Sequence, residues 1–583
     1  MDEKTENKKI IARIENLARE REKIFSLPPE KVLNTILESP QPTALVHSFS
    51  EQDLYFLIHS IGIEDAHPLL YLASDKQWEY LIDMEVWEKD RIELSPATKW
   101  FDLLFKIDPN RFIRWSLDQK SAFMEFYLFK NIEVRVREID QDPSDFGDEF
   151  FSFDELFYIR LIDEPIEEEP EEDDSRETNR KHHKAFLLKY LKTIADMDHI
   201  LYQNMLFMSS NIIPAESEEE AYRLRNVRLA EKGFLPYEEA VGIYQPMQVN
   251  DFRRQKIKFT SDDPEKKLFL PVPLSHAGVL EEENNFTLAL KGIPPDEVLN
   301  QIQAEFAGLC NQLISADRKV IRDKDELKHI VRKACGYLNI GLENLTEKDK
   351  EPAVNLFTSL IQSYPLINIF RVGFGRAMEL KWRAEKWLKK SWFNAKGLML
   401  GFWDEKWMGV LGGLLIKKPL YYDNYITGEL YREFFSIQDI KVTEKSLNEI
   451  MAFDEIFSLI SIEPKADKDG YLTYKNFILT LWARHYLGLT EELLPLTLDE
   501  FRCFFDSLRV DKNHSRKTDP SMKANFLDWL SDKTGRTHLE ISGDLGPSLE
   551  NLFNEIENEY REVSPDDLDP RHIHLFLITV KKD

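Results

Sequence analysis

Short amphipathic helices dominate the amino-terminal part of the sequence, and this rhythm limits the folds that are open to the chain. Signals that start helices follow one another closely there, at Ser50 with Asp53, Ser74 with Gln77, Ser95 with Pro96, and Asp108 with Pro109. In the first two pairs a side-chain oxygen can cap an amide of the first turn, and in the other two a proline takes the first helical position, where a missing N–H costs nothing. The segment therefore predicts a succession of short helices.

Each expected helix carries one apolar stripe. Apolar side chains recur at steps of three and four residues, as in Leu54, Leu57, Ile58 and Ile61, and again in Trp78, Leu81 and Ile82. A helix with a single apolar stripe needs a neighbour to cover it. Short helices that cover one another in sequence form an α-solenoid-like array, which typically presents a concave surface to a partner. We therefore expect such an array in the amino-terminal part of the chain.

One stretch of this array resembles a known domain. The sequence SEQDLYFLIHSIGIEDAHPLLYLASDKQWEYLIDMEVWEKDRIE is similar to the helical-repeat amino-terminal domain of MgtE-type magnesium transporters, and the resemblance covers residues 28–130. The likeness lies in the helix rhythm and not in metal ligands, so it implies a fold and no handling of magnesium. The membrane helices of those transporters have no counterpart in this sequence.

Two further stretches resemble a family that spans most of the chain. The sequences EEEAYRLRNVRLAEKGFLPYEEAVGIY and FRVGFGRAMEL look like those of an uncharacterised bacterial family of similar length, whose members carry only a domain-of-unknown-function label. The resemblance implies a shared architecture but brings no activity with it.

Composition narrows the classes of partner. Aspartate and glutamate outnumber lysine and arginine by 104 to 76, a formal net charge of -28, so most of the surface repels nucleic acid. The longest apolar run, GVLGGLLI, is far shorter than the roughly 20 residues that span a bilayer, and the charged start lacks the apolar core of a signal peptide. The three cysteines show no CxxC spacing, which argues against a zinc knuckle or a disulfide framework. We expect a soluble cytoplasmic protein without membrane insertion.

The fold class that we expect is mainly α, in a multi-domain protein with small β elements. Alternating stretches at 132–139 and 156–162 predict a hairpin, and further β elements are expected near 257–273 and at the carboxyl terminus. The expected segments are an amino-terminal helix (1–27), a helical-repeat domain with the hairpin (28–162), an acidic linker (163–178), a long-helix unit (179–244), an irregular connector with several prolines (245–294), an aromatic-rich helical domain (295–440), and a helical domain with an EF-hand-like loop and carboxyl-terminal strands (441–583).

Two helices in the long-helix unit carry specific expectations. A single helix is expected over 179–209, because apolar residues from Leu187 to Met208 recur with a near-helical period, and we interpret this stripe as core. The helix that follows carries Arg225 and Arg228, which we expect on a solvent-facing charged edge.

The glycines of RVGFGRAMEL invite comparison with a dinucleotide-binding loop. Gly373 and Gly375 have the spacing of the first two glycines of that motif, but the third position is Met378 and no strand precedes the segment. We expect these glycines to permit close packing of helices.

The segment KADKDGYLTYKN, residues 465–476, resembles a calcium-binding loop. Gly470 stands where such loops require glycine, at position six, and Asp467 and Asp469 stand at positions three and five, which also supply ligands. Lys465 and Asn476, however, replace the Asp and the bidentate Glu that begin and end the ligand set. Because unit charges about 4 Å apart interact by roughly 4 kcal/mol at an effective dielectric near 20, these replacements lower the calcium affinity by orders of magnitude. We expect a helix–loop–helix with a structural role.

The carboxyl-terminal part holds the one set of side chains that suggests a metal site. The stretch RHIHLFLITV alternates like a buried strand, which places His572 and His574 on the same side. The stretch THLEISGD is a second strand candidate, with His538 and Glu540 on one face. If the two strands paired in a suitable register, these four side chains would form a set that suits zinc or non-haem iron.

The expected function is that of a scaffold or adaptor. We expect the chain to bind a protein partner through its amino-terminal helical array, to need no cofactor, and to avoid nucleic acid. No residue is identified as catalytic. Two alternatives remain open: a metal-dependent enzyme that uses the carboxyl-terminal histidines, and a regulator that responds to divalent cations, as the transporter-like helices and the altered calcium loop suggest.

Overall fold

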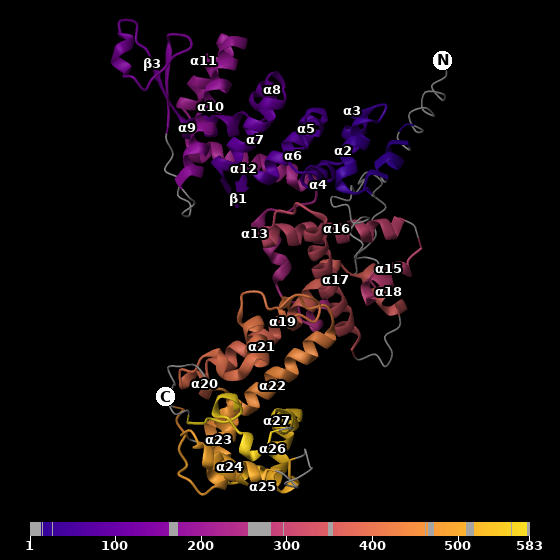
Figure 1. Ribbon diagram of the computed structural model, residues 1–583. Helices are drawn as coiled ribbons and strands as arrows, with labels where there is room; N and C mark the ends of the chain where they lie inside the picture. Colours follow the sequence, from indigo (N-terminus) through magenta and orange to yellow (C-terminus); the bar gives the residue numbers. More distant parts are fainter. Residues whose placement is uncertain are drawn as a thin grey trace. The chain divides into compact units, whose positions relative to one another are not determined.

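The computed structural model confirms a mainly helical protein with small β elements (Figure 1). It describes residue 13 and residues 16–21, 23–25, 27–162, 173–254, 282–294, 297–347, 354–460, 462–464, 472–508, 518–560 and 563–579. Of residues 173–180, 297 and 324 it describes the backbone alone. The amino-terminal helix expected over 1–27, the β element expected over 257–273 and much of the acidic linker fall largely outside these residues.

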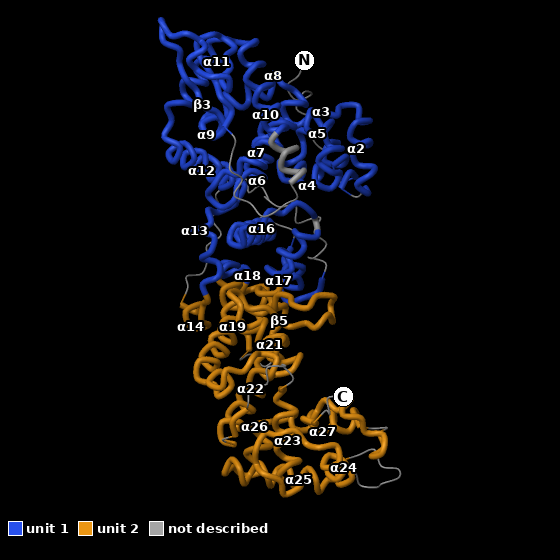
Figure 2. Tube along the Cα trace, turned by 60° about the vertical axis from the view of Figure 1, so that its left-hand side comes forward, with its two compact units in different colours: residues 1–245, 258–334, 361–367 blue, residues 246–257, 335–360, 368–583 orange. Residues whose placement is uncertain are grey.

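The chain separates into two compact units, neither of which is a continuous stretch (Figure 2). Unit 1 comprises residues 1–245, 258–334 and 361–367, and unit 2 comprises residues 246–257, 335–360 and 368–583. Each unit has its own core of buried apolar side chains. The chain therefore passes between the two units more than once.

Unit 1 begins with a run of short helices that follow one another closely in Figure 1. These are α2 (Pro29–Leu37), α3 (Pro42–Ser48), α4 (Glu51–Ile61), α5 (His67–Leu72), α6 (Asp75–Glu85), α7 (Leu94–Ile107), α8 (Pro109–Gln119) and α9 (Ser121–Asn131). Helix α4 packs on both α2 and α6, and α5 packs on both α3 and α7. This layered order is that of an α-solenoid-like array, as the apolar stripes predict.

Three of the four start signals in this run cap helices as expected. Ser50, Ser74 and Asp108 each accept a hydrogen bond from a backbone N–H in the first turn of α4, α6 and α8. The fourth expectation is wrong, because α7 begins at Leu94, one residue before Ser95. There the carbonyl of the residue preceding Leu94 accepts the first intrahelical bond, so the helix has started before the serine can cap it.

Two antiparallel hairpins accompany the array. Strands β1 (Trp87–Glu88) and β2 (Arg91–Ile92) form a short hairpin between α6 and α7. Strands β3 (Ile132–Val136) and β4 (Phe157–Leu161) pair over their full length, which confirms the hairpin expected there.

The single helix expected over 179–209 is wrong. Two helices, α10 (Asp173–Met197) and α11 (His199–Ser210), replace it, and α10 begins within the stretch that we expected to be linker. Asp198 causes the break, because its carboxylate accepts hydrogen bonds from the backbone N–H groups of Ile200 and Leu201 and so caps a new helix. The apolar period continues through the break, but the direction of the chain does not.

The remainder of unit 1 lies beyond α11. It contains α12 (Pro214–Glu231), α13 (Tyr237–Ala240), the 3-10 turn η2 (Val241–Tyr244), α15 (Asn285–Lys291), α16 (Glu297–Asp317) and the first half of α17 (Lys324–Thr346). Helix α12 packs along α9, and α16 packs against α13 and η2. Helix α12 also contacts β2, the second strand of the short hairpin that follows α6.

Unit 2 is built on a second set of helices. Its elements include α14 (Val249–Phe252), most of α18 (Val354–Ser363) and α19 (Leu366–Leu388), then α20 (Trp392–Ala395), η5 (Leu400–Trp403), α21 (Asp404–Leu415), the hairpin of β5 (Tyr421–Tyr422) and β6 (Tyr431–Arg432), α22 (Ile437–Ile460), α23 (Tyr474–Tyr486), α24 (Leu498–Ser507), α25 (Pro520–Thr534), α26 (His538–Leu545), α27 (Pro547–Glu559), η6 (Pro565–Asp567) and η7 (Pro570–His572). The aromatic side chains expected to form a core do so, with Trp403 fully buried among neighbouring rings.

Alternation predicts two strands in the carboxyl-terminal part. One prediction is wrong because the stretch is helical, and the other stretch forms less β structure than expected. THLEISGD forms helix α26, because Thr537 and Glu540 make a capping box and the buried residues Ile541 and Leu545 are four apart. The final stretch forms only an isolated bridge in the part of the chain that the structure describes, between Leu496 and Ile578.

The calcium-like loop is flanked by the two helices that we expected. These are α22 before it and α23 after it, while residues 465–471 lie outside the described part of the chain. Asn476, at the last position of the motif, belongs to the first turn of α23 and forms a capping box with Thr473. Its side-chain oxygen is thus committed to a backbone amide.

Close approach of two helix backbones in unit 2 explains one of the expected glycines. A Cβ atom on Gly373 of α19 would lie 1.9 Å from the carbonyl oxygen of Tyr337 in α17, and one on Gly341 would lie 2.1 Å from the carbonyl oxygen of Ile369. By contrast, a Cβ atom on Gly375 would have no heavy atom nearer than 3.4 Å. The helices therefore cross at Gly373 and not at Gly375.

We predict that Gly373→Ala destabilises the protein by about 2 kcal/mol or more, because backbone atoms must move apart to admit the methyl group. Gly375→Ala is the matched control, and we expect it to be neutral or stabilising by up to about 1 kcal/mol, since alanine is the better helix former. Urea denaturation of both variants, followed by circular dichroism, measures the difference. Equal stabilities would contradict the close crossing.

Candidate functional site

The four candidate metal ligands near the carboxyl terminus are not brought together. His538 lies on α26 with its Nε2 3.0 Å from Oδ1 of Asp528, and the carboxylate of Glu540 accepts a hydrogen bond from the Thr537 amide in its capping box. His572 and His574 are both exposed. Among the described residues, no group of three or more histidine, cysteine, aspartate or glutamate side chains is placed to hold a metal ion.

A buried carboxylate on α6 lies at the centre of a charged cluster in unit 1. Oδ1 of Asp83 accepts from Nζ of Lys120 at 2.7 Å and from Nη2 of Arg228 at 2.8 Å, and its Oδ2 accepts from Nε of Arg228 at 2.6 Å. The backbone carbonyl of Asp83 accepts from Nε of Arg225 at 2.7 Å. The solvent-facing edge expected for Arg225 and Arg228 is therefore wrong: both arginines reach inward from α12 to one residue of α6.

The charges of this cluster hold one another in place. Burial alone raises the pKa of Asp83, but the neighbouring Lys120 and Arg228 outweigh it and lower the pKa below its usual range. Burial likewise lowers the pKa of Lys120, against the attraction of Asp83. A carboxylate that is held by two cations and whose pKa is lowered is a weak base at neutral pH, so this cluster is suited to joining helices and not to acid–base chemistry.

A second carboxylate, two residues further along α6, makes a different set of contacts. Glu85 accepts a hydrogen bond from the hydroxyl of Tyr55 on α4, and its Oε1 lies 3.3 Å from Nε2 of His59. Arg322, in the segment between α16 and α17, approaches both oxygens at 3.1 and 3.2 Å. Tyrosine, histidine, glutamate and arginine are residue types of many catalytic sites, which makes this arrangement the strongest candidate for one.

The protonation states argue against catalysis at this second cluster. Burial by itself raises the pKa of Glu85, but the contacts with His59, Arg322 and Tyr55 outweigh it and lower the pKa to about 2. Burial and the adjacent Glu85 raise the pKa of Tyr55. At neutral pH the carboxylate is thus a weak base and the phenol a weak acid, whereas an efficient acid–base catalyst has a pKa near the working pH. The cluster instead ties α4, α6 and the α16–α17 segment together.

Sequence reasoning missed both carboxylates. They stand in the run YLIDMEVW, where acids interrupt an otherwise apolar stretch at the end of a helix. Such acids are buried only when they are paired, so the pattern itself was a usable signal. Their partners, up to 237 residues away in the sequence, left no local trace.

An exposed apolar surface on α11 is the second candidate. Ile200, Phe207 and Met208 are 72%, 55% and 54% exposed, and Ile213, just beyond the helix, is 58% exposed. We call these four residues the α11 face. On the opposite side of the helix, residues such as Leu206 are buried against unit 1. Helix α11 is therefore apolar on both sides, and only one of them is covered by the described residues.

Comparison with known proteins assigns the chain to a family. The model of a family of unknown function, DUF6178, matches residues 8–579. The chain belongs to this family. No curated protein and no solved structure matches it, and the comparisons give no support to the resemblance with the MgtE-type domain. Within the described part of this DUF6178 protein, none of the helices combines the length and hydropathy that a bilayer crossing requires.

We predict that Glu85→Gln destabilises this DUF6178 protein by up to about 3 kcal/mol at neutral pH, since the pKa of Glu85 falls from 4.5 to about 2 on folding. A lowered pKa stabilises the folded chain above pH 4.5, and this stabilisation is lost as the pH falls from 4.5 towards 2. The difference between wild type and variant should therefore shrink below pH 4.5. Urea denaturation at several pH values measures it.

The exposed Glu88 provides the matched control, because Glu88→Gln changes the same charge without a buried cluster. We expect that variant to lie within about 0.5 kcal/mol of wild type at every pH. A pH-independent loss in Glu85→Gln would contradict the role given to its charge.

Proposed function

We propose that this DUF6178 protein is a non-catalytic helical adaptor of the cytoplasm that binds a protein partner through the α11 face. The observation that carries the proposal is the exposure of four large apolar side chains within fourteen residues, Ile200 to Ile213. Large apolar side chains that are exposed close together in the chain mark docking sites in many proteins, because leaving them in water costs free energy that a partner recovers.

The occupant that fits the α11 face best is an amphipathic helix of another protein. Ile200, Phe207 and Met208 are related by seven and eight residues, so they form a ridge along the helix of the kind that packs into a groove between side chains of a second helix. Methionine adds a flexible and polarisable surface that adapts to such a partner.

A membrane surface is a poorer fit for this face. The formal net charge of -28 opposes attraction to anionic lipids, and the acids Asp196 and Asp198 stand beside the apolar residues. Interfacial helices that bind lipid usually carry lysine and arginine next to their apolar face.

The charged clusters on α6 support a non-catalytic role. The carboxylates of Asp83 and Glu85 are both committed to internal cations, and the candidate metal ligands are dispersed. A divalent-cation sensor remains without support from the described residues, since the loop at 465–471 lies outside them.

We predict that a photo-reactive p-benzoylphenylalanine at position 207 cross-links one defined protein in cells that naturally express this chain. The same residue at position 539 is the matched control, because Leu539 is also an exposed apolar side chain but stands alone on α26 in unit 2. Mass spectrometry identifies the product. The purified partner should bind the wild-type chain, and Ile200→Ser with Met208→Ser should weaken the affinity at least about tenfold, because two apolar contacts are lost.

Several outcomes of this experiment would overturn the proposal. They are equal cross-linking from positions 207 and 539, products that contain only lipid or a second copy of this chain, and an affinity for the partner that the double variant leaves unchanged. Circular dichroism of the variants checks that the surface changes leave the fold intact.

A further inference from the structure

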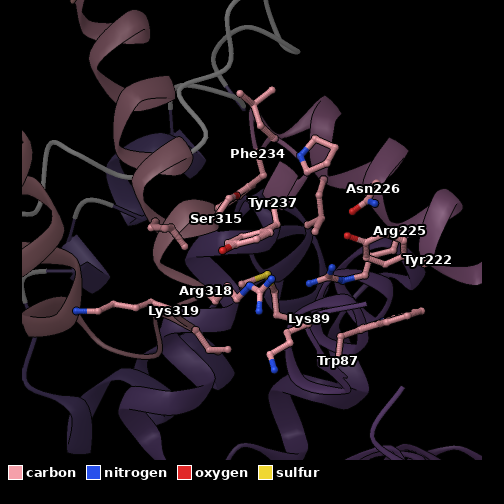
Figure 3. A pocket seen from close by; sticks show the side chains of 16 residues that line it. Trp87, Lys89, Tyr222, Arg225, Asn226, Phe234, Tyr237, Ser315, Arg318 and Lys319 are labelled. Atoms are coloured by element: carbon pink, nitrogen blue, oxygen red, sulfur yellow. The ribbon is translucent and has the colours of Figure 1, made fainter. Parts of the chain in front are cut away.

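A pocket of about 110 Å³ opens in unit 1 beside the end of α6 (Figure 3). Its walls come from five places in the sequence: the end of α6, the β1–β2 hairpin, α12, the segment that leads into α13, and the carboxyl end of α16 with the residues that follow it. Asp83 and Glu85, the two clustered carboxylates, flank the pocket residue Met84 in the sequence but point to their own partners. The clusters on α6 therefore fix the elements that surround the pocket.

The charge of the pocket is opposite to that of the chain. Its lining includes Lys89, Arg225, Arg318 and Lys319, and it includes no aspartate or glutamate. In the whole sequence aspartate and glutamate outnumber lysine and arginine by 104 to 76. The pocket, with four cations and no acid, is therefore positively charged in a negatively charged protein. In Figure 3 the charged ends of Lys89, Arg225 and Arg318 lie towards the middle of the view, while Lys319 extends away from them. Concave sites of one sign attract ligands of the other.

The charged groups of these side chains retain free donors. Arg225 uses Nε for the carbonyl of Asp83 and lies over the Trp87 ring at 5.4 Å, and within the described residues its terminal nitrogens form no hydrogen bond or ion pair. The guanidinium of Arg318 lies 3.5 Å from the centre of the Tyr237 ring and forms no ion pair with any described residue. In the part of the chain that the structure describes, the ion-pair partner of Lys89 is its exposed sequence neighbour Glu88 alone, at 4.0 Å. The aromatic contacts orient the cations without neutralising them.

The backbone at Arg318 makes its side chain unexpected. The N–H of Lys319 donates to the carbonyl of Ile314, which is the hydrogen bond of a Schellman motif at the end of α16. Arg318 occupies the left-handed position of that motif, with φ of 52°. Glycine is the usual residue there, because a side chain strains this conformation. An arginine at this position gives up some stability, and its side chain lines the pocket.

Lys89 repeats this pattern on the opposite wall. It stands in the turn between β1 and β2 with φ of 60°, a conformation for which hairpin turns prefer glycine, asparagine or aspartate. Among the described non-glycine residues with positive φ, Lys89 and Arg318 are the two that are basic, and both line the pocket. Strained backbone that presents functional side chains is common at binding sites.

We propose that this pocket binds a small phosphate monoester, with its phosphoryl group among Arg225, Arg318 and Lys89 and its organic part against the aromatic side chains of Trp87 and Tyr222. A phosphate monoester carries about two negative charges and three terminal oxygens, which match several cations better than a carboxylate does. Guanidinium groups suit such oxygens because they donate two parallel hydrogen bonds.

The size of the pocket limits the ligand. Pockets that enclose whole drug-sized molecules usually measure about 300–1,000 Å³, so 110 Å³ accommodates a phosphoryl group and a single ring or short chain. The inference is independent of the adaptor function, since the α11 face contributes no residue to the pocket.

Isothermal titration calorimetry of the full chain tests the proposal with three probes. We expect phenyl phosphate to bind at one site per chain and inorganic phosphate to bind more weakly at the same site. Benzoate, which keeps the ring but replaces the phosphoryl group with a carboxylate, should bind at least about tenfold more weakly than phenyl phosphate, and the affinity for phenyl phosphate should fall as salt is added.

Glycine substitutions separate binding from folding. Arg318→Gly and Lys89→Gly each remove a cation while relieving a strained backbone, so we expect unchanged or higher thermal stability together with at least about tenfold weaker binding of phenyl phosphate. Glu155→Gly is the matched control, because Glu155 has φ of 59° in unit 1 but does not line the pocket. It should leave the affinity unchanged.

The result that overturns the site is the absence of saturable binding of both phosphate probes, or binding that both pocket variants retain in full. Inorganic phosphate that binds as tightly as phenyl phosphate would overturn the assignment to an ester. Benzoate that binds as tightly as phenyl phosphate would overturn the assignment to a phosphoryl group. If a glycine variant is less stable than wild type, Arg318→Gln and Lys89→Gln test the same loss of charge without a change of backbone preference.

Discussion

The carboxylate of Asp83 is the interaction on which the arrangement of unit 1 depends most. It is buried, and it joins α6 to Lys120 at the end of α8 and to Arg228 on α12, more than a hundred residues further along the chain. Removing one partner of such a group leaves an uncompensated buried charge, which typically costs 3–5 kcal/mol. Two helices in apolar contact can shift along each other at little cost, whereas the hydrogen bonds to Asp83 form only when the donors and the carboxylate oxygens are in one relative position. It therefore sets the position of α12 relative to the helical array.

Local chemistry accounts for the parts of the fold that the sequence predicts. Ser50, Ser74 and Asp108 cap helices because the capping bond spans only three residues, and apolar spacing identifies the stripe that each helix buries. Where two local signals compete, the alternation of THLEISGD proved weaker than the capping box of Thr537 and Glu540. A stretch of eight residues can fit both the two-residue period of a strand and the four-residue spacing of a helix. In such a stretch the capping box is the signal that separates the two structures.

The sites depend on contacts that no local pattern contains. Arg225 and Arg228 look like a surface edge in the sequence because nothing nearby indicates that Asp83 will face them. The break at Asp198, which creates the α11 face, was hidden because the apolar period runs through it, although aspartate is itself a frequent capping residue. Pairing over long sequence distances requires the three-dimensional fold, whereas caps and stripes do not.

Some of the described basic side chains of unit 1 are paired with an internal carboxylate, and others are not. This difference separates the cations that stabilise the fold from those that are available to a ligand. Lys120 and Arg228 are satisfied by Asp83, so their charges stabilise the fold and are not available to a ligand. Arg225, on the same helix as Arg228, spends one nitrogen on the backbone of Asp83 and keeps the others towards a pocket without acids. Burial lowers the pKa of Arg225, which means that its charged form lacks the full solvation of a surface arginine. A bound anion would supply the interaction that solvent does not. Arg225 therefore stabilises the fold through Nε and is placed to bind an anionic ligand through its terminal nitrogens.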